Sequence, residues 1–246
     1  MVLGPKQIAM EMLNFFSNLF SSTRTCQLEM ALETVHCLVI EDMNKELLVE
    51  FTENEVKVAL NQMAPLKALG LDGMPPLFYQ HYWNLVGKDT TTSILSFLNS
   101  ATLLKHLNHT FITLTPKVKN PELVYEFHPI SLCNVLYKIF SKVLTKRLKK
   151  ILPYIIIEHQ SAITKDHLIS DNILIAFESL HSMHNHKSTK EGYMAIKLDM
   201  SKVYDRVEWS FLECMMEKLG FNGRWITLMM LCVSSVSYYI LINGAP

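Results

Sequence analysis

The sequence contains few cysteines, and they form neither a disulfide nor a zinc pattern. The 246 residues include five cysteines, an odd number, and none forms a Cys-x-x-Cys pair. This spacing argues against a disulfide framework and a cysteine-based zinc site, and it favours a reducing compartment. We therefore expect an intracellular protein, nuclear or cytoplasmic, with free thiols at Cys26, Cys37, Cys133, Cys214 and Cys232.

Long hydrophobic runs and an excess of charge are also missing. The most apolar stretch, Trp225 to Val233, is far shorter than the ~20 residues that span a membrane, and the first ten residues lack a signal-peptide pattern. We expect no membrane partner.

Lysine plus arginine (23) equals aspartate plus glutamate (23), so any attraction for a polyanion must be local. Residues 116–150 have such a local surplus of positive charge. Their acids are Glu122 and Glu126, and their bases are Lys117, Lys119, Lys138, Lys142, Lys146, Arg147, Lys149 and Lys150.

What is present predicts an ordinary globular protein of mixed structure. Hydrophobic residues make up 49% and charged residues 19%, and the length suits one large domain or two small ones. Apolar positions at helical spacing predict helices over 6–20, 51–60, 131–152, 171–184 and 209–219. Thr52 and Glu55 form a capping box at the start of the second helix. Residues 67–76 are rich in glycine and proline and predict a loop, and the alternating 109–115 predicts a strand.

The most informative stretch runs from Gly192 to Asp205. It predicts a short apolar strand that delivers Asp199 to a turn and then to a helix. A carboxylate at the exit of a strand is a common ligand for a hard cation such as Mg²⁺. The alternative is a capping or hydrogen-bonded aspartate, and position alone leaves the two equally open. A phosphatase-type Asp-x-Asp pair is excluded, because position 201 is serine.

Other charged residues have both structural and functional interpretations. Asp205 and Glu208 have the spacing of a capping box before a helix that Gly220 ends, which favours a structural Asp205. Lysines on the polar side of helix 131–152 more often form a solvated face, and a nucleic-acid backbone contact is the alternative for Lys138, Lys142 and Lys146. Lys117 is a better candidate for a phosphate contact, because it follows a strand in a loop with a proline on each side.

The last residues predict a strand and a turn. Residues 233–242 are typical of a strand, and Asn243-Gly244 is the strongest short signal for a hairpin turn. A hairpin turn predicts a return strand, but only Ala245 and Pro246 follow. We therefore expect a chain cut within a sheet, with an exposed strand edge.

Taken in order, several segments resemble the reverse transcriptase of plant LINE-type (non-LTR) retrotransposons. The resemblance covers nearly the whole chain from about Phe51. It rests on residues 67–75 with Phe78-Tyr79, 107–112 with 116–121, 127–135 with 137–139, 159–162 with Asp171-Asn172, and the run 197–209, Lys-Leu-Asp-Met-Ser-Lys-Val-Tyr-Asp-Arg-Val-Glu-Trp.

The resemblance implies an α+β fold with right-hand polymerase architecture. A helical N-terminal extension (1–63) would precede a fingers-like region (64–190) and the start of a palm (191–246), truncated before the second catalytic hairpin. It implies that Asp199 and the carbonyl of Met200 bind catalytic Mg²⁺, that Tyr204 lies under the incoming sugar, and that Lys117 lies near the triphosphate. The implied partners are an RNA template, a DNA primer and deoxynucleotides; the oligomeric state is not indicated.

The sequence also departs from this family. The family takes its second share of metal-binding carboxylates from a downstream Ala-Asp-Asp hairpin, whereas this chain has no Asp-Asp pair and no acid after Glu217. His128 stands where the family has arginine, and Val203 would crowd the sugar site. We expect a fragment of an RNA-directed DNA polymerase that is inactive as this chain. The alternatives are a non-catalytic nucleic-acid-binding remnant using residues 116–150, or an inert relic that does not fold stably.

Overall fold

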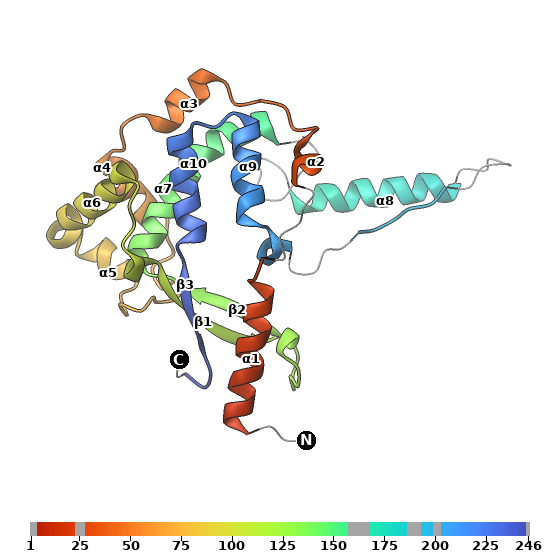
Figure 1. Cartoon of the computed structure of the whole chain (residues 1–246), viewed down its shortest axis with the longest axis horizontal. Coiled ribbons are helices and arrows are strands. Elements are labelled where there is room, and N and C mark those ends of the chain that lie inside the picture. Colours follow the sequence, from red (N-terminus) through yellow and green to blue (C-terminus); the bar gives the residue numbers. More distant parts are fainter. Residues whose placement is uncertain (1–3, 23–27, 157–167, 186–192, 199–202, 245–246) are drawn as a thin grey trace.

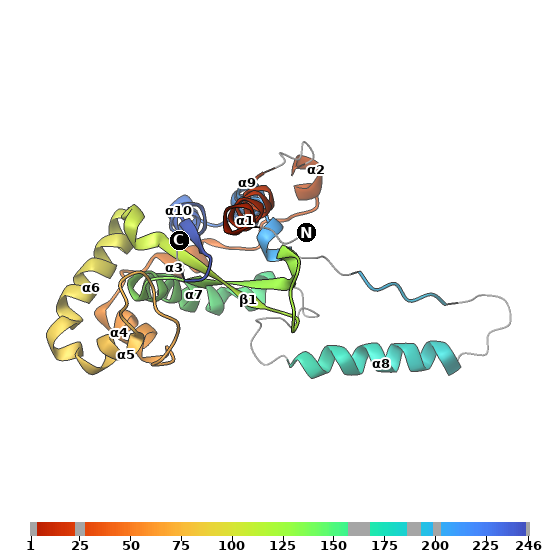
Figure 2. The same ribbon diagram turned by 90° about the horizontal axis from the view of Figure 1, so that it is seen from below.

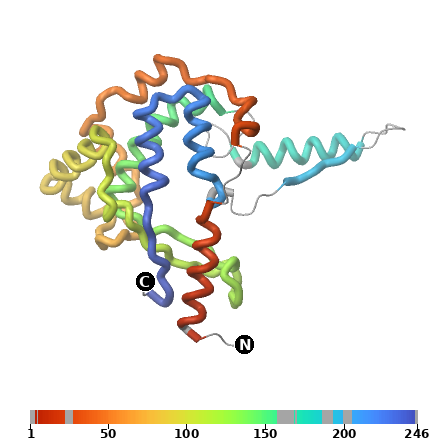
Figure 3. The backbone as a smooth tube through the Cα atoms, in the orientation of Figure 1, coloured from red at the N-terminus to blue at the C-terminus, as the bar shows by residue number. Residues whose placement is uncertain are grey.

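Helices dominate the computed structural model, which describes residues 4–22, 28–156, 168–185, 193–198 and 203–244 (Figures 1 and 3). The helices and strands, in chain order, are α1 (Pro5–Leu19), α2 (Leu28–Leu32), α3 (Glu41–Leu48), α4 (Glu53–Asn61), α5 (Pro76–His81), α6 (Trp83–Ser100), η1 (Lys105–Asn108), β1 (His109–Pro116), η2 (Val124–Glu126), β2 (Phe127–Leu132), α7 (Val135–Ile155), α8 (Ile169–Asn185), η3 (Val203–Arg206), α9 (Trp209–Leu219), α10 (Gly223–Ser234) and β3 (Ser237–Leu241). The expected mixture of helices with a small sheet is confirmed. The right-hand polymerase architecture stays a prediction.

Several local predictions are confirmed at the level of hydrogen bonds. Thr52 caps α4: its hydroxyl accepts from the Glu55 amide at 3.3 Å, and its own amide donates to the Glu55 carboxylate at 2.9 Å. Gly220 ends α9 with a φ of 93°, a left-handed conformation that suits glycine. The loop over 67–75, the strand β1 and the helices α1 and α8 also lie where the sequence predicts them.

The helix predicted over 131–152 begins later than expected. Residues 127–132 instead form β2, which pairs antiparallel with β1, from Phe111 opposite Leu132 to Pro116 opposite Phe127. Asn134 has extended backbone angles and precedes the first turn of α7, which then runs to Ile155. The apolar residues before Asn134 fitted the helical period by chance, and strand pairing decided their structure.

The predicted strand over 233–242 is also shorter than expected. Helix α10 continues to Ser234, and the hydroxyls of Ser234 and Ser235 donate to carbonyls four residues back, as serines in helices do. β3 then pairs parallel with β1, so the strand order is β2-β1-β3. Asn243 and Gly244 both have positive φ, 53° and 81°, which confirms the predicted turn geometry. The residues after this turn lie outside the described part of the chain.

One hydrophobic core connects distant parts of the sequence. It joins Leu60 of α4 and Leu98 of α6 with Phe140 of α7 and Trp225 of α10, all four of them essentially inaccessible to solvent. All three predicted regions (1–63, 64–190 and 191–246) therefore contribute side chains to the same core. In Figure 1, α7 and α10 run close together above the sheet, and α4 and α6 lie to one side.

Helix α8 lies apart from this core. It projects from the body in Figures 1 and 2, and its apolar side chains Ile173, Phe177 and Leu180 are exposed. The extended segment 193–198, which precedes Asp199, is exposed as well. The sequence predicts a strand there, and this prediction is wrong for the described residues 193–198, which do not belong to the β2-β1-β3 sheet.

Candidate functional site

The predicted catalytic turn lies at the edge of the described chain. Asp199 and Met200 fall outside the described residues. Tyr204 lies in the short 3₁₀ helix η3, between that turn and α9. Asp205 also lies in η3, and the predicted capping box is wrong: α9 begins after Glu208, and no side-chain hydrogen bond from this residue caps the helix. The chain tightens into a 3₁₀ turn before α9, which places Asp205 too early to cap it.

A cavity of about 440 Å³ lies beside η3. Its walls come from η3 and the first residue of α9, from the end of α1, and from the start of β3, including Asp205, Trp209 and Tyr238. Burial, and then the Asp205 carboxylate, raise the pKa of the Tyr238 phenol. Phe20 closes one side by packing its ring edge-on to Tyr238, with centroids 5.1 Å apart. The described residues after the predicted catalytic turn therefore face a polar cavity.

Lys117 lies at the start of the β1–β2 connection and is exposed. Its amide donates to the Glu126 carbonyl at 2.7 Å, and its Nζ donates to the Tyr125 carbonyl at 2.9 Å. The Glu126 carboxylate accepts from the amides of Glu122 and Leu123, which lowers its pKa. These bonds hold the connection in a closed shape. One of the three N–H donors of the Lys117 ammonium is used within the protein.

The lysines of α7 lie against the loop that follows α4. Lys138 donates through Nζ to the Ala68 carbonyl at 2.6 Å, and Lys142 donates to the Gln62 carbonyl at 3.1 Å. Partial burial, then the charges of Lys67, Lys146 and Lys149, lower the pKa of Lys142. Lys138 and Lys142, two of the three lysines predicted to contact nucleic acid, therefore also bind the loop that follows α4.

Lys67 belongs with these lysines of α7, although the sequence analysis did not identify it. It acts electrostatically on both Lys138 and Lys142 although it lies about seventy residues earlier in the chain. No local pattern marks it, because only the folding of the loop onto α7 brings it there. The cluster contains Lys67, Lys138, Lys142, Lys146 and Lys149, and we call it the lysine cluster.

Gly70 explains how closely this loop approaches α7. A Cβ atom at position 70 would lie 2.6 Å from backbone atoms of Asn134, so only glycine fits there. Asn134 is buried, and its side chain accepts from the Asp72 amide at 3.4 Å and donates to the Leu107 carbonyl at 3.3 Å. One asparagine thereby connects the loop, η1 and α7.

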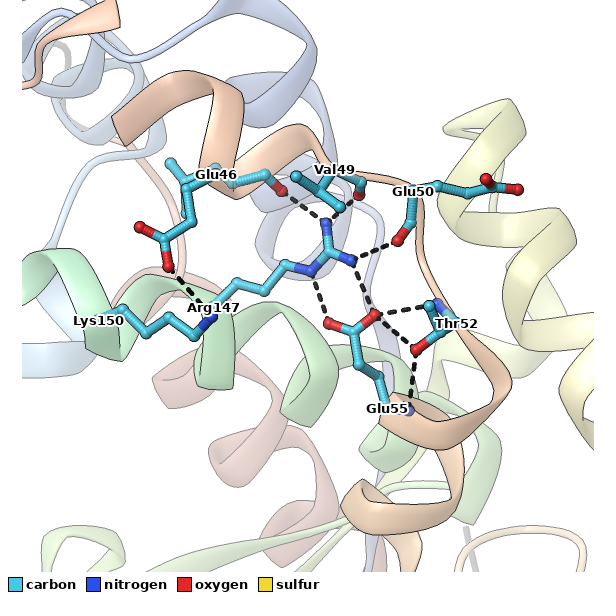
Figure 4. A network of polar contacts seen from close by, with 8 residues as sticks. Glu46, Val49, Glu50, Thr52, Glu55, Arg147 and Lys150 are labelled. Carbon is cyan, nitrogen blue, oxygen red and sulfur yellow. Dashed lines mark hydrogen bonds and ion pairs between the residues drawn. The ribbon is translucent and has the colours of Figure 1, made fainter. Parts of the chain in front are cut away.

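Arg147 is the most extensively bonded side chain described, and sequence reasoning treated it as one more base (Figure 4). It lies on α7 and is 6% exposed. Its guanidinium donates to both carboxylate oxygens of Glu55, at 2.7 and 2.8 Å. It also donates to the carbonyls of Leu47, Val49 and Glu50. Arg147 therefore ties the connection between α3 and α4 to α7.

The surroundings of Arg147 favour the charged forms of both partners. The guanidinium carbon lies 3.7 Å from the centre of the Phe51 ring, a cation–π contact. Burial raises the pKa of Glu55, but the bond to Arg147 and the donors of Thr52 outweigh it, and the net pKa is lowered. The helical period offered a signal, because position 147 falls on the apolar stripe between Leu144 and Ile151.

The described residues contain no ready-made metal site and no membrane-spanning helix. No group of three or more histidine, cysteine, aspartate or glutamate side chains is placed to hold a metal ion within the described ranges. Within the same ranges, no helix is both long and apolar enough to cross a membrane. The four cysteines of the described ranges, at positions 37, 133, 214 and 232, are free thiols, as expected.

Comparison with known proteins identifies the family. The family model described as reverse transcriptase (RNA-dependent DNA polymerase) matches residues 116–244, more than half of the chain. The match covers β1 from its last residue, α7, η3, α9 and α10, and it ends in the turn after β3. The chain belongs to the reverse transcriptase family.

A curated relative points to a mobile element. The transposon TX1 uncharacterized 149 kDa protein of Xenopus laevis is 26% identical over 243 residues. The alignment covers 97% of this chain but 18% of the relative, so the chain spans less than one fifth of that protein's length. The predicted relation to a retroelement reverse transcriptase is thereby supported. The LINE type and the plant origin stay predictions.

Proposed function

We propose that this chain is the fingers and the first part of the palm of a LINE-type retroelement reverse transcriptase, of plant origin. The observation that carries the proposal is the family match over 116–244, which contains the run from Lys197 to Trp209. In this proposal Asp199 and the Met200 carbonyl bind Mg²⁺, Tyr204 lies under the sugar, and Lys117 lies near the triphosphate. RNA template, DNA primer and deoxynucleotides are the substrates.

The donors of this chain fit only part of the metal site that such a polymerase needs. A carboxylate and a carbonyl oxygen suit Mg²⁺, which binds through one or two carboxylates together with substrate phosphates. Phosphoryl transfer with two metals, however, needs carboxylates from more than one strand, so that both the attacking and the leaving oxygen are held. The chain carries no acid after Glu217. We therefore assign this chain binding and positioning roles only.

Primer extension tests the proposal that these 246 residues provide only part of the metal site. Purified chain, given an RNA template, a DNA primer, deoxynucleotides and Mg²⁺, is expected to add no nucleotides above a protein-free blank. The physical reason is that Asp199 alone cannot hold two metals in line. An active reverse transcriptase in parallel reactions is the control for the substrates. Templated extension that disappears in Asp199→Asn would contradict the expected inactivity.

The lysine cluster favours a second candidate function, a non-catalytic nucleic-acid-binding module that uses residues 116–150. Four lysines of α7 and Lys67 of the loop after α4 form the lysine cluster, and their mutual repulsion would ease when a polyanion binds. In this candidate Lys138, Lys142 and Lys146 contact the nucleic-acid backbone. An intact polymerase would use the same lysine cluster. The two candidate functions therefore share the contact with the nucleic-acid backbone and differ in whether the chain is catalytic.

Charge reversal in the lysine cluster tests this contact. We expect Lys142→Glu/Lys146→Glu to weaken RNA binding and to reduce the slope of log affinity against log salt by about 1–2, because each phosphate contact releases roughly one counterion. Lys57→Glu, on the exposed side of α4, is the matched control and should leave the slope unchanged. An affinity and slope indifferent to the double reversal would remove this candidate.

A cooperative thermal transition separates both candidates from an inert, unfolded relic. A core that joins α4, α6, α7 and α10 predicts such a transition. A broad, non-cooperative melting curve would favour the relic.

A further inference from the structure

The two faces of the sheet are covered differently. Thr110 and Ile112 of β1 point to one face and are buried, with 2% and 3% exposure. Tyr238, which pairs with Thr110, points to the same face and contacts Phe20 at the end of α1. A small cavity lined by Ile8 and Met12 of α1 and by Leu114 and Phe127 lies on this side too. In Figure 2, α1 is seen end-on to one side of the strands, so this face is covered in part by α1.

The opposite face carries three neighbouring rings, which we call the aromatic face: His109, Phe111 and Tyr239. Phe111 pairs with Tyr239 across β1 and β3. The centroid of the Tyr239 ring lies 4.7 Å from that of His109 and 6.4 Å from that of Phe111. Tyr239 is 57% exposed, and His109 and Phe111 are partly exposed. On the other side of β1, Ile130 is 43% exposed, so the open surface extends over all three strands.

The charge of this face suits a polyanion. None of β1, β2 and β3 contains an aspartate or glutamate. His128 pairs with Thr115 and therefore lies on the same face, and Lys117 follows β1 at the same parity. The nearest acids in the sequence are Glu122 and Glu126 in the β1–β2 connection, and the Glu126 carboxylate is taken up by two backbone amides. The Lys117 ammonium and the His128 imidazole thus lie at one end of the aromatic face, and the strands contain no carboxylates.

We propose that the aromatic face stacks unpaired bases of a single-stranded nucleic acid, with its phosphates toward His128 and Lys117. Every base has a π-face, so exposed rings bind single strands with little dependence on sequence. Bases paired in a duplex are already stacked on one another and cannot use the rings. The proposal rests on the proposed function, because it assigns to this family member a surface that holds unpaired nucleotides. It adds His109, Phe111 and Tyr239, to which no role has been given above.

Fluorescence-anisotropy titration with a labelled 12-nucleotide oligouridylate tests the proposal. Tyr239→Ala and Phe111→Ala are each expected to weaken binding about 5- to 100-fold, since one stacked ring contributes that much, without changing the salt dependence. Tyr239→Phe keeps the ring and should bind within about twofold of the parent chain. Tyr154→Ala removes another exposed tyrosine, 67% exposed near the end of α7, and is the matched control.

The outcomes separate this proposal from the proposed function. Equal affinities for Tyr239→Ala and Tyr154→Ala would overturn the aromatic face as a base-binding surface. So would a Tyr239→Ala variant that changes only the sedimentation coefficient, because the face would then be a contact between copies of the chain. A parent chain that binds a primer–template duplex but not the oligouridylate overturns this proposal and leaves the proposed function standing. Binding to neither probe overturns both.

Discussion

Replacing Arg147 by alanine is expected to lower the free energy of unfolding by about 3–5 kcal/mol, because a buried charge partner disappears. The change removes the Arg147 donors from the carbonyls of Leu47 and Val49 and from the Glu55 carboxylate, which keeps only the donors of Thr52. A buried acceptor without a hydrogen-bond partner has lost its contacts with water and gained none in the protein, which lowers the free energy of unfolding. A typical domain is stable by only ~5–15 kcal/mol, so the variant should melt at a much lower temperature. Chemical denaturation followed by circular dichroism measures the difference.

Two further variants control this experiment. Lys150→Ala removes the exposed ion pair between Lys150 of α7 and Glu46 of α3, 3.1 Å apart, and should cost about 0–1 kcal/mol. Arg147→Lys keeps the charge but not the planar fork that reaches Glu55 and three carbonyls, so its cost should lie between the other two. A cost for Arg147→Ala as small as that of Lys150→Ala would contradict the role of Arg147 as the connection between α3, α4 and α7.

Replacing Trp225 by alanine is expected to cost about 3–5 kcal/mol, since it removes the largest fully buried side chain of the core. The destabilisation should extend to distant parts of the sequence, because Trp225 of α10 shares its core with α4, α6 and α7. Within the described residues its indole Nε1 has no hydrogen-bond partner. Trp225→Phe therefore reduces the side-chain volume without breaking a hydrogen bond, and it should lower the free energy of unfolding clearly less than the alanine variant does. Urea titration measures both.

Trp209 provides the matched comparison for this core position. It begins α9 and is 44% exposed, so Trp209→Ala should cost at most about 0.5–1 kcal/mol. If Trp225→Ala unfolds only a part of the chain, seen as two separate transitions, then α9 and α10 would not share a core with α7. A single transition at lower denaturant concentration is expected instead.

The confirmed predictions rest mainly on local signals, although the local capping-box signal of Asp205 and Glu208 was wrong. The capping box of Thr52 and Glu55, Gly220 at the end of α9 and the Asn243-Gly244 turn need only neighbouring residues, and each is confirmed. The boundaries of α7 and β3 were misplaced because both depend on pairing with β1, a partner distant in the sequence. Pattern alone could not decide between helix and strand for these short apolar runs.

The candidate site shows the same division. Motif order alone identified the reverse transcriptase family, which the family match confirms. Lys67 and Asn134 could not be assigned from sequence, because their importance arises when the loop after α4 folds onto α7. Arg147 was recognisable from its place on an apolar stripe, yet only the structure gives its five acceptors. Asp199, Met200 and Tyr204 keep their assigned roles as predictions.

Iron-mediated backbone cleavage tests most directly whether Asp199 is a metal-binding carboxylate. Fe²⁺ replaces Mg²⁺ at oxygen ligands, and with ascorbate and peroxide it cuts the backbone next to its site. Primer–template and a deoxynucleotide are present, because substrate phosphates complete the coordination of such ions. We predict cleavage close to residues 199–200 that is lost in Asp199→Asn and kept in Asp205→Asn. Cleavage that persists in Asp199→Asn, or that disappears only in Asp205→Asn, would contradict the assignment.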